Sequence, residues 1–312
     1  MQFSATLLCL LIALINIQKG ASLKPAADIT ARISRRELFQ ATTSATVALS
    51  TLPYAAVGAT SIASRLSSDN ISIPSPSYAT ELNGVDNLYF PNFMEGAWAV
   101  TQTLVNVSTP LGLKYVGGPN GLERIAAETM AEASKQVGKP VNLKLRFVGT
   151  RWGVAEDRIY NTKQRLDAFA GRSVVSSVEY SNVSGSNRAS VLAMGGTEED
   201  PLQTTFVRFK GPAAQKTFVV SHGSQALSDS QWVAYELDRG IFALTNQNTA
   251  PPLTTDSEII WMLEKRDDNY VQGKLRIAGY LNPNSDVLYF DARQRAVSIQ
   301  DYTMDFKREK QQ

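Results

Sequence analysis

A glycine-rich turn is the first group of residues in this sequence whose types and spacing could do chemistry. Gly117, Gly118 and Gly121 lie in Gly-Gly-Pro-Asn-Gly, directly before a helical pattern. Free backbone N–H groups at a helix start can hold a phosphate, so these glycines form a candidate anion-binding turn. The Lys-Ser/Thr pair of a P-loop and the spacing of a dinucleotide-binding fold are both missing. A tight turn that starts the helix is the alternative interpretation.

The only histidine, His222, would have to serve any histidine-dependent catalysis or metal binding. Ser221 would lie on the opposite face of a strand, and Ser224 lacks the strained turn of a nucleophile elbow. A strand-end imidazole that senses pH is the other interpretation of His222. The only thiol, Cys9, lies in a segment that we expect to be removed. We therefore predict no catalytic residue, no metal site and no cofactor motif, which favours a non-enzymatic protein.

Adjacent acidic residues form the remaining candidates. Glu156 and Asp157 lie between Trp152 and Arg158, so they either form salt bridges at a strand-to-helix corner or contribute to binding. The other acidic clusters, at 198–200 and 267–268, have no calcium-binding spacing and are interpreted as solvated turns.

The elements that must position these residues are mostly strands. Apolar and polar residues alternate most clearly at 141–147, which predicts a strand with one solvated face. β-Branched and aromatic residues between turn signals predict further strands at 97–107, 172–180, 204–210, 215–221, 231–237, 241–244, 257–265, 272–280, 286–291 and 296–307. Short spacing between them favours a single antiparallel β-barrel domain over a parallel sheet.

Two helices interrupt the strand pattern. Apolar residues recur at helical spacing from Leu122 to Val137, with Gly138 directly after them. A second helix is predicted from an Asn161 cap through Phe169, before Gly171. The fold class is therefore mainly β, with one or two inserted helices.

The N-terminal region resembles two export signals in series. Residues 7–17 are apolar but too short to span a bilayer, which predicts a signal peptide at 1–22. Within 23–59, Arg35 and Arg36 precede an uncharged segment that ends in Val-Gly-Ala, which resembles a twin-arginine signal. A Pro- and Ser-rich linker at 60–81 and one domain at 82–312 would follow.

This layered leader resembles that of a plastid (chloroplast) protein of the thylakoid lumen. Secretion is the alternative, because Asn70, Asn106 and Asn182 begin glycosylation sequons. The first 80 residues hold six basic and three acidic residues, which leaves 25 basic and 26 acidic residues in the rest. A near-neutral domain gives no charge argument for nucleic acid. We also expect no transmembrane segment in the mature protein.

Three runs of sequence carry a family resemblance: Pro-Asn-Phe-Met-Glu-Gly-Ala-Trp at 91–98, Val-Gly-Gly-Pro-Asn-Gly-Leu-Glu-Arg at 116–124 and Trp-Gly-Val-Ala-Glu-Asp-Arg at 152–158. They resemble an uncharacterised thylakoid-lumen family, a domain of unknown function, of plants, algae and cyanobacteria. The resemblance implies a location and no chemistry.

Gly96 and Trp98 at the first long strand are also similar to the opening of lipocalins and other calycins. That resemblance implies a Trp98 that plugs one barrel end, beneath a cation from Arg293, Arg295 or Arg308. The mid-chain signature and the disulfides of secreted lipocalins are absent.

Many aromatic residues on the predicted strands suggest either a filled core or a barrel that holds one small apolar ligand. The candidate ligand-binding residues are Trp98, Arg146, Trp152 and Tyr180, and the candidate ligands are pigments, lipids and quinones. An auxiliary role on a photosynthetic membrane complex is the alternative function, and a lumenal enzyme of unknown reaction is the third.

Overall fold

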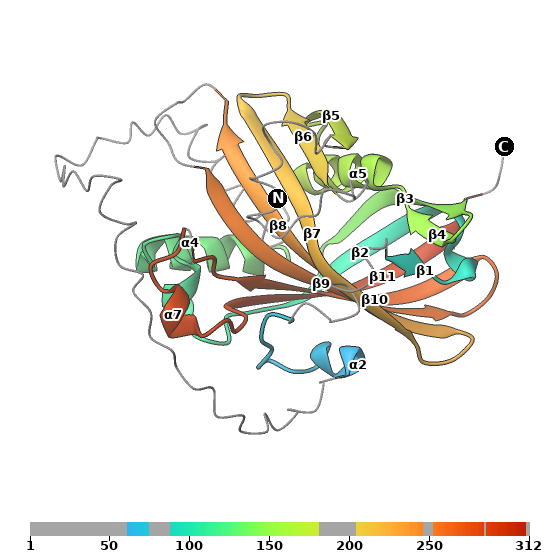
Figure 1. The fold of residues 1–312 in the computed structure, drawn as a ribbon, viewed down its shortest axis with the longest axis horizontal. Helices are drawn as coiled ribbons and strands as arrows, with labels where there is room; N and C mark the ends of the chain where they lie inside the picture. Colours follow the sequence, from blue (N-terminus) through green and yellow to red (C-terminus); the bar gives the residue numbers. More distant parts are fainter. Residues whose placement is uncertain (1–60, 75–87, 181–203, 246–251, 284, 310–312) are drawn as a thin grey trace, which may run out of the picture.

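The curvature of a single antiparallel sheet determines the shape of the protein (Figure 1). The computed structural model describes residues 61–74, 88–180, 204–245, 252–283 and 285–309. Eleven strands pair in the order β1-β4-β3-β2-β11-β10-β9-β8-β7-β6-β5 and curl into a half-barrel. The mainly β, antiparallel class predicted from the sequence is confirmed, and the sheet is consistent with a calycin-like barrel.

The strands are β1 (Tyr89–Phe90), β2 (Gly96–Ser108), β3 (Pro140–Thr150), β4 (Gly153–Glu156), β5 (Val175–Tyr180), β6 (Thr205–Phe209), β7 (Ala213–Ala226), β8 (Gln231–Leu244), β9 (Leu253–Lys265), β10 (Tyr270–Tyr280) and β11 (Ser298–Arg308). The helices are α2 (Ile62–Arg65), α4 (Glu123–Ser134), α5 (Arg158–Ala170) and α7 (Tyr289–Ala292), with 3-10 turns η2 (Asn92–Met94) and η3 (Leu113–Val116).

Three of the predicted strands are wrong in detail. The separate strands predicted at 231–237 and 241–244 form one continuous strand, β8, because β7 and β9 both pair along it past Gly240. The strand predicted at 286–291 is a turn followed by α7. Its aromatic residues favour a strand locally, but no neighbouring strand pairs with them in the described sheet.

Both predicted inserted helices are present as α4 and α5, but the cap predicted for α5 is wrong. The carboxylate of Asp157 accepts a hydrogen bond from the Tyr160 N–H at 3.0 Å and caps the helix. Asn161 is instead fully buried, and its side-chain amide bonds both backbone groups of Arg146 in β3. Gly171 ends α5 in the left-handed conformation at φ 64°.

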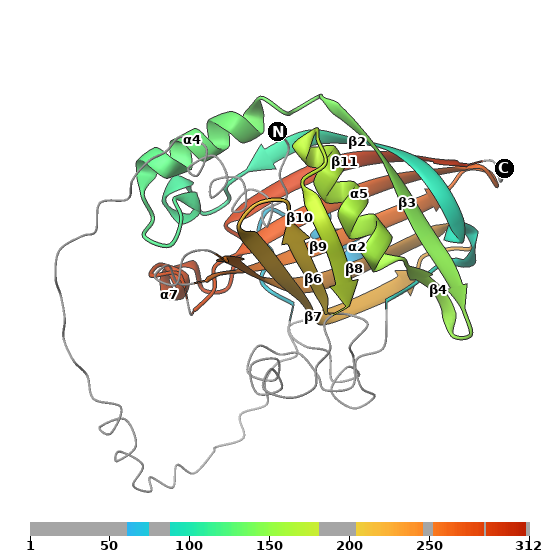
Figure 2. The same cartoon turned by 90° about the horizontal axis from the view of Figure 1, so that it is seen from above.

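The sheet has a concave and a convex face, and α5 covers the concave one (Figure 2). Side chains alternate between the two faces along each strand. The main core lies on the concave side and includes Phe90, Trp98, Phe147, Trp232, Trp261, Leu263, Met304 and Phe306. The segment 61–74 contributes to a second core on the convex side, with Ile71, Leu237, Ile260, Ala278 and Ile299.

Trp98 is buried at one end of the concave core. Its indole N–H donates to the Met94 carbonyl at 2.7 Å, and its ring meets Phe306 edge-on. The guanidinium of Arg308, from the last strand, lies 4.3 Å from the ring centroid. Of the three arginines considered from the sequence, Arg308 therefore supplies the cation.

None of the helices within the described ranges has both the length and the apolar character needed to cross a lipid bilayer.

Candidate functional site

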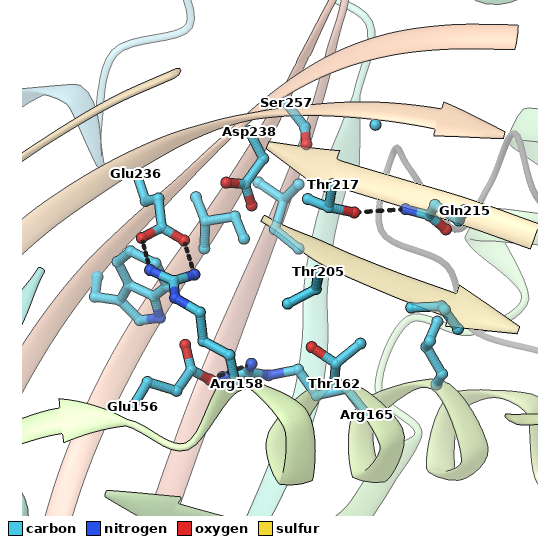
Figure 3. A pocket seen from close by; sticks show the side chains of 16 residues that line it. Glu156, Arg158, Thr162, Arg165, Thr205, Gln215, Thr217, Glu236, Asp238 and Ser257 are labelled. Atoms are coloured by element: carbon cyan, nitrogen blue, oxygen red, sulfur yellow. Dashed lines mark hydrogen bonds and ion pairs between the residues drawn. The ribbon is translucent and has the colours of Figure 1, made fainter. Parts of the chain in front are cut away.

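A cavity of about 150 Å³ lies between α5 and the concave face of the sheet (Figure 3). Its apolar walls are formed by Leu166, Val207, Ile259, Trp261 and Ile277. Its polar lining consists of Glu156, Arg158, Thr162, Arg165, Thr205, Gln215, Thr217, Glu236, Asp238 and Ser257. A cavity of this volume accommodates about one six-membered ring.

Strand and helix periodicity bring the charged residues together. Glu236 and Asp238 are two residues apart in β8, so both point to the concave face, whereas Leu237 between them points to the convex core. Arg158, Thr162 and Arg165 lie at helical spacing on the face of α5 that covers the cavity. The cavity therefore forms where the polar positions of a strand meet one face of a helix.

Arg158 and Glu236 form a two-pronged buried ion pair between the first turn of α5 and β8. The two guanidinium nitrogens donate to the two carboxylate oxygens at 2.8 and 2.5 Å. Their side chains are only 14% and 3% exposed. Burial disfavours the charge of Arg158, but the Glu236 carboxylate outweighs it and raises the pKa of the guanidinium. This pair anchors α5 to the sheet.

Glu156, which is 7% exposed, forms a second ion pair with Arg165, which is 29% exposed and lies about two turns along α5 from Arg158. The Asn161 amide also donates to this carboxylate at 3.0 Å. Burial alone would raise the pKa of Glu156, but the charges of Arg165 and Arg158 hold it below its usual value. Glu156 is therefore held as a carboxylate, with Oε1 bound by both Arg165 and Asn161, and it serves the strand-to-helix corner that its position in the sequence suggested.

Asp238 differs from the other two carboxyls because it lacks a matching cation. Its Oδ1 is buried and has no hydrogen-bond partner in the described part of the chain. The side chain points into the cavity, beside its cross-strand neighbour Ser257 (Figure 3). Burial, followed by repulsion from the Glu236 carboxylate, raises the pKa of Asp238 well above its usual value.

The cavity lining thus holds three carboxyls and two guanidinium groups. Because both guanidinium groups already bind carboxylates, the raised pKa favours a protonated Asp238. A protonated carboxyl in an apolar site donates one strong hydrogen bond. The arrangement suits a ligand with an apolar body and a hydrogen-bond acceptor such as a carbonyl oxygen.

We predict that Asp238→Asn becomes more stabilising as the pH rises. The pKa of Asp238 in the folded protein lies above the unfolded value of about 3.9. Below about pH 3.9, where Asp238 is protonated, its contribution to the free energy of unfolding is therefore complete. The contribution is lost as the pH rises through the folded pKa. The neutral amide avoids that loss, so the variant gains about 1–3 kcal/mol over the wild type at the alkaline end.

Denaturant unfolding at a series of pH values measures this difference. Asp229→Asn, in an exposed turn, is the matched control and should change the free energy of unfolding by about 0.5 kcal/mol or less, as most surface substitutions do. A difference for Asp238→Asn that does not change with pH would contradict the prediction.

The four ligand-binding residues chosen from the sequence do not meet at this cavity. Trp98 is in the core, and Trp152 is 64% exposed beneath Arg151 in the β3–β4 turn. Arg146 binds Asp157 and stacks on Tyr160. Tyr180 lines a neighbouring hollow together with Glu156 and Arg158, and burial raises its pKa. Of the four, Tyr180 shares a hollow with Glu156 and Arg158, which also line the cavity.

The glycine-rich turn has the geometry of a tight turn. The N–H groups of Gly121 and Leu122 donate to the carbonyls of Gly118 and Gly117 at 2.9 and 3.0 Å. Gly118 and Gly121 both have positive φ, at 76° and 62°. The first N–H groups before α4 are thus engaged by the turn's own carbonyls.

His222 lies on β7, directly opposite Glu236 of β8, and Glu236 lines the cavity. Within the ranges that the structure describes, no three His, Cys, Asp or Glu residues gather as a metal site would require.

Sequence reasoning missed Glu236 and Asp238. Their signal was present, because Tyr-Glu-Leu-Asp at 235–238 places two carboxyls on one face of a strand, on either side of the buried Leu237. In a sequence alone this is also the pattern of a strand with a solvated face. The covering helix α5, which turns this face into a cavity wall, is visible only in the structure.

The model of a protein family described as a domain of unknown function (DUF6816) matches residues 83–310. No curated protein and no solved structure matches the chain.

Proposed function

The chain belongs to the DUF6816 family, and we propose that it binds a small, largely apolar molecule in the concave cavity without catalysing a reaction. The observation that carries this proposal is the buried, unpartnered Oδ1 of Asp238, which points into a mostly apolar space. A buried polar group without a partner costs about 1–3 kcal/mol, and a ligand acceptor would recover that cost.

Size and chemistry favour a quinone headgroup among the three ligand classes. About 150 Å³ suits a single ring, and a ring carbonyl would accept a hydrogen bond from the protonated Asp238 carboxyl. Pigments and lipids are larger, and only part of each would enter. Leu166, Ile259 and Trp261 would contact the ring faces.

A short-chain benzoquinone is the probe that tests the proposal. We expect it to raise the melting temperature of the wild type and to quench the fluorescence of Trp261 in the cavity wall. Asp238→Leu removes the donor and should weaken binding about fivefold to tenfold. Asp238→Asn keeps a donor, so it should bind at every pH, whereas wild-type binding weakens as the pH rises.

Asp229→Asn is again the control and should bind as the wild type does. Galactolipid and pigment extracts form the other arms of the experiment. Equal binding by the wild type and Asp238→Leu would overturn the role of Asp238. A failure of all three ligand classes to shift the melting temperature would overturn ligand binding.

We propose the thylakoid lumen as the location, with secretion as the alternative. The support comes from the leader, where a signal-peptide-like segment precedes a twin-arginine-like one. Both segments lie outside the described residues.

A second candidate function is docking to a photosynthetic membrane complex. The supporting observation is an apolar surface around α7, where Phe290 and Val287 are 83% and 70% exposed. Leu122 is also exposed and lies next to this surface, because the Leu288 side chain packs close to Gly121. Exposed apolar side chains that gather in this way are typical of partner-binding surfaces.

A further inference from the structure

The segment 61–74 occupies the convex face of the sheet, on the opposite side from α5 (Figures 1 and 2). It precedes the part of the chain that the family model matches, and its composition suggested a linker. Ile71 is only 2% exposed and packs in the convex core, with Ile62, Leu66 and Ile73 partly buried beside it. The segment is therefore bound to the fold by apolar contacts, which a linker does not need.

A buried carboxylate on β9 binds the only basic side chain of this segment. Arg65 Nε and Nη2 donate to the two oxygens of Glu258 at 2.8 and 2.6 Å. The Glu258 side chain is 0% exposed, and Tyr280 donates its hydroxyl to the same carboxylate at 2.6 Å. Two parallel N–H donors match both carboxylate oxygens, a geometry that a lysine cannot reproduce.

Arg276 on β10 binds the backbone of the same segment. Its guanidinium is held by Asp301 and donates to the carbonyls of Arg65 and Ser68 at 3.0 and 2.6 Å. The Arg65 carbonyl is at the last residue of α2, where backbone acceptors have no partner within the helix, and Ser68 lies three residues further along the chain. The sheet thus provides a cation for the carbonyls as well as an anion for Arg65.

Strand-like pairing completes the binding. The Ile73 N–H donates to the Gln294 carbonyl, and the Ala296 N–H donates to the Ile71 carbonyl, both at 2.8 Å. Ser72 and Arg295, which lie between these two hydrogen bonds, form an antiparallel β-bridge. Main-chain hydrogen bonds that give affinity, together with side-chain contacts that give specificity, are a recurring way in which proteins recognise extended peptides.

We propose that the convex face of β8–β10 is a peptide-recognition site whose occupant is residues 61–74 of the same chain, selected through Arg65, and that leader removal leaves this segment on the mature protein. The site is separate from the concave cavity and does not depend on a ligand there. A cut after Ala59, which the small residues of Val-Gly-Ala suit, preserves Ser61, the N-cap of α2, and Arg65. A cut after Arg65 would leave the convex face without its anchor.

Cutting the chain after folding tests recognition directly. A specific protease site inserted between Pro76 and Ser77 of a chain that begins at Thr60 would separate the segment covalently from the body. We expect the cut segment to co-elute with the body in gel filtration. With Arg65→Lys, which keeps the charge but not the two-pronged contact, we expect it to dissociate at least tenfold faster.

Arg124→Met is the matched control, because Arg124 forms an exposed pair with Glu128 on α4. It should retain the segment as the wild type does. Loss of the segment from the cut wild type, or equal retention by Arg65→Lys, would overturn the proposal.

The N terminus of the native protein gives a second measurement that needs no variant. Mass spectrometry of the mature chain should find a start at or before Ser61. A start at any residue after Arg65 would overturn the proposal, because the recognised side chain would be absent.

Discussion

Replacing Trp98 by alanine is expected to lower the free energy of unfolding by about 3–5 kcal/mol, as other large aromatic-to-alanine changes in cores do. Trp98 is 0% exposed, and its indole N–H donates a hydrogen bond to the Met94 carbonyl. The change would also remove the edge-on contact with Phe306 and the ring beneath the Arg308 guanidinium. Denaturant unfolding of the purified chain measures the loss.

Trp152→Ala is the matched control for this experiment. Its side chain is 64% exposed at a turn and contacts the Arg151 guanidinium. We expect a loss of about 0.5 kcal/mol or less, as for most surface substitutions. If Trp98→Ala cost no more than Trp152→Ala, Trp98 would not support the end of the concave core.

Arg158→Met is expected to destabilise the protein by about 3–5 kcal/mol, because it leaves the Glu236 carboxylate buried without its cation. The penalty arises from the unpaired charge and not from the loss of a favourable pair. Arg158→Met combined with Glu236→Leu should therefore recover most of the lost stability, since both ends of the contact become apolar.

Arg124→Met provides the contrast, because its partner Glu128 is exposed and such pairs contribute about 0.2–1 kcal/mol. Equilibrium unfolding of the two single variants and the double variant measures all three values. A double variant as unstable as Arg158→Met alone would show that the cost does not come from Glu236.

The sequence by itself determined the class of fold and much of its local structure. The alternation at 141–147 became β3, and the helical spacing from Leu122 became α4. Such patterns reflect which face of an element is buried. Apolar residues recur every two residues along a strand and every three to four residues along a helix. The resemblance to calycins also supplied Arg308 as one of three cations for Trp98.

Local patterns were not sufficient where pairing decides the structure. Residues 286–291 are rich in strand-forming side chains, but β10 and β11 use their edges to pair with β9, with β2 and with each other. Without a neighbouring strand the segment forms a turn and α7. A strand requires a partner, and no local preference supplies one.

Only the tertiary structure decided the candidate site and the bound N-terminal segment. Arg158 meets Glu236 across 78 residues of sequence, and Arg65 meets Glu258 across 193. Which charges meet depends on strand register, on the curvature of the sheet and on the face that α5 covers. An acidic residue on a strand has the same pattern in the sequence whether it faces water or a covering helix. Burial and the neighbouring Glu236 carboxylate, which only the structure shows, separate Asp238 from the solvated carboxylates.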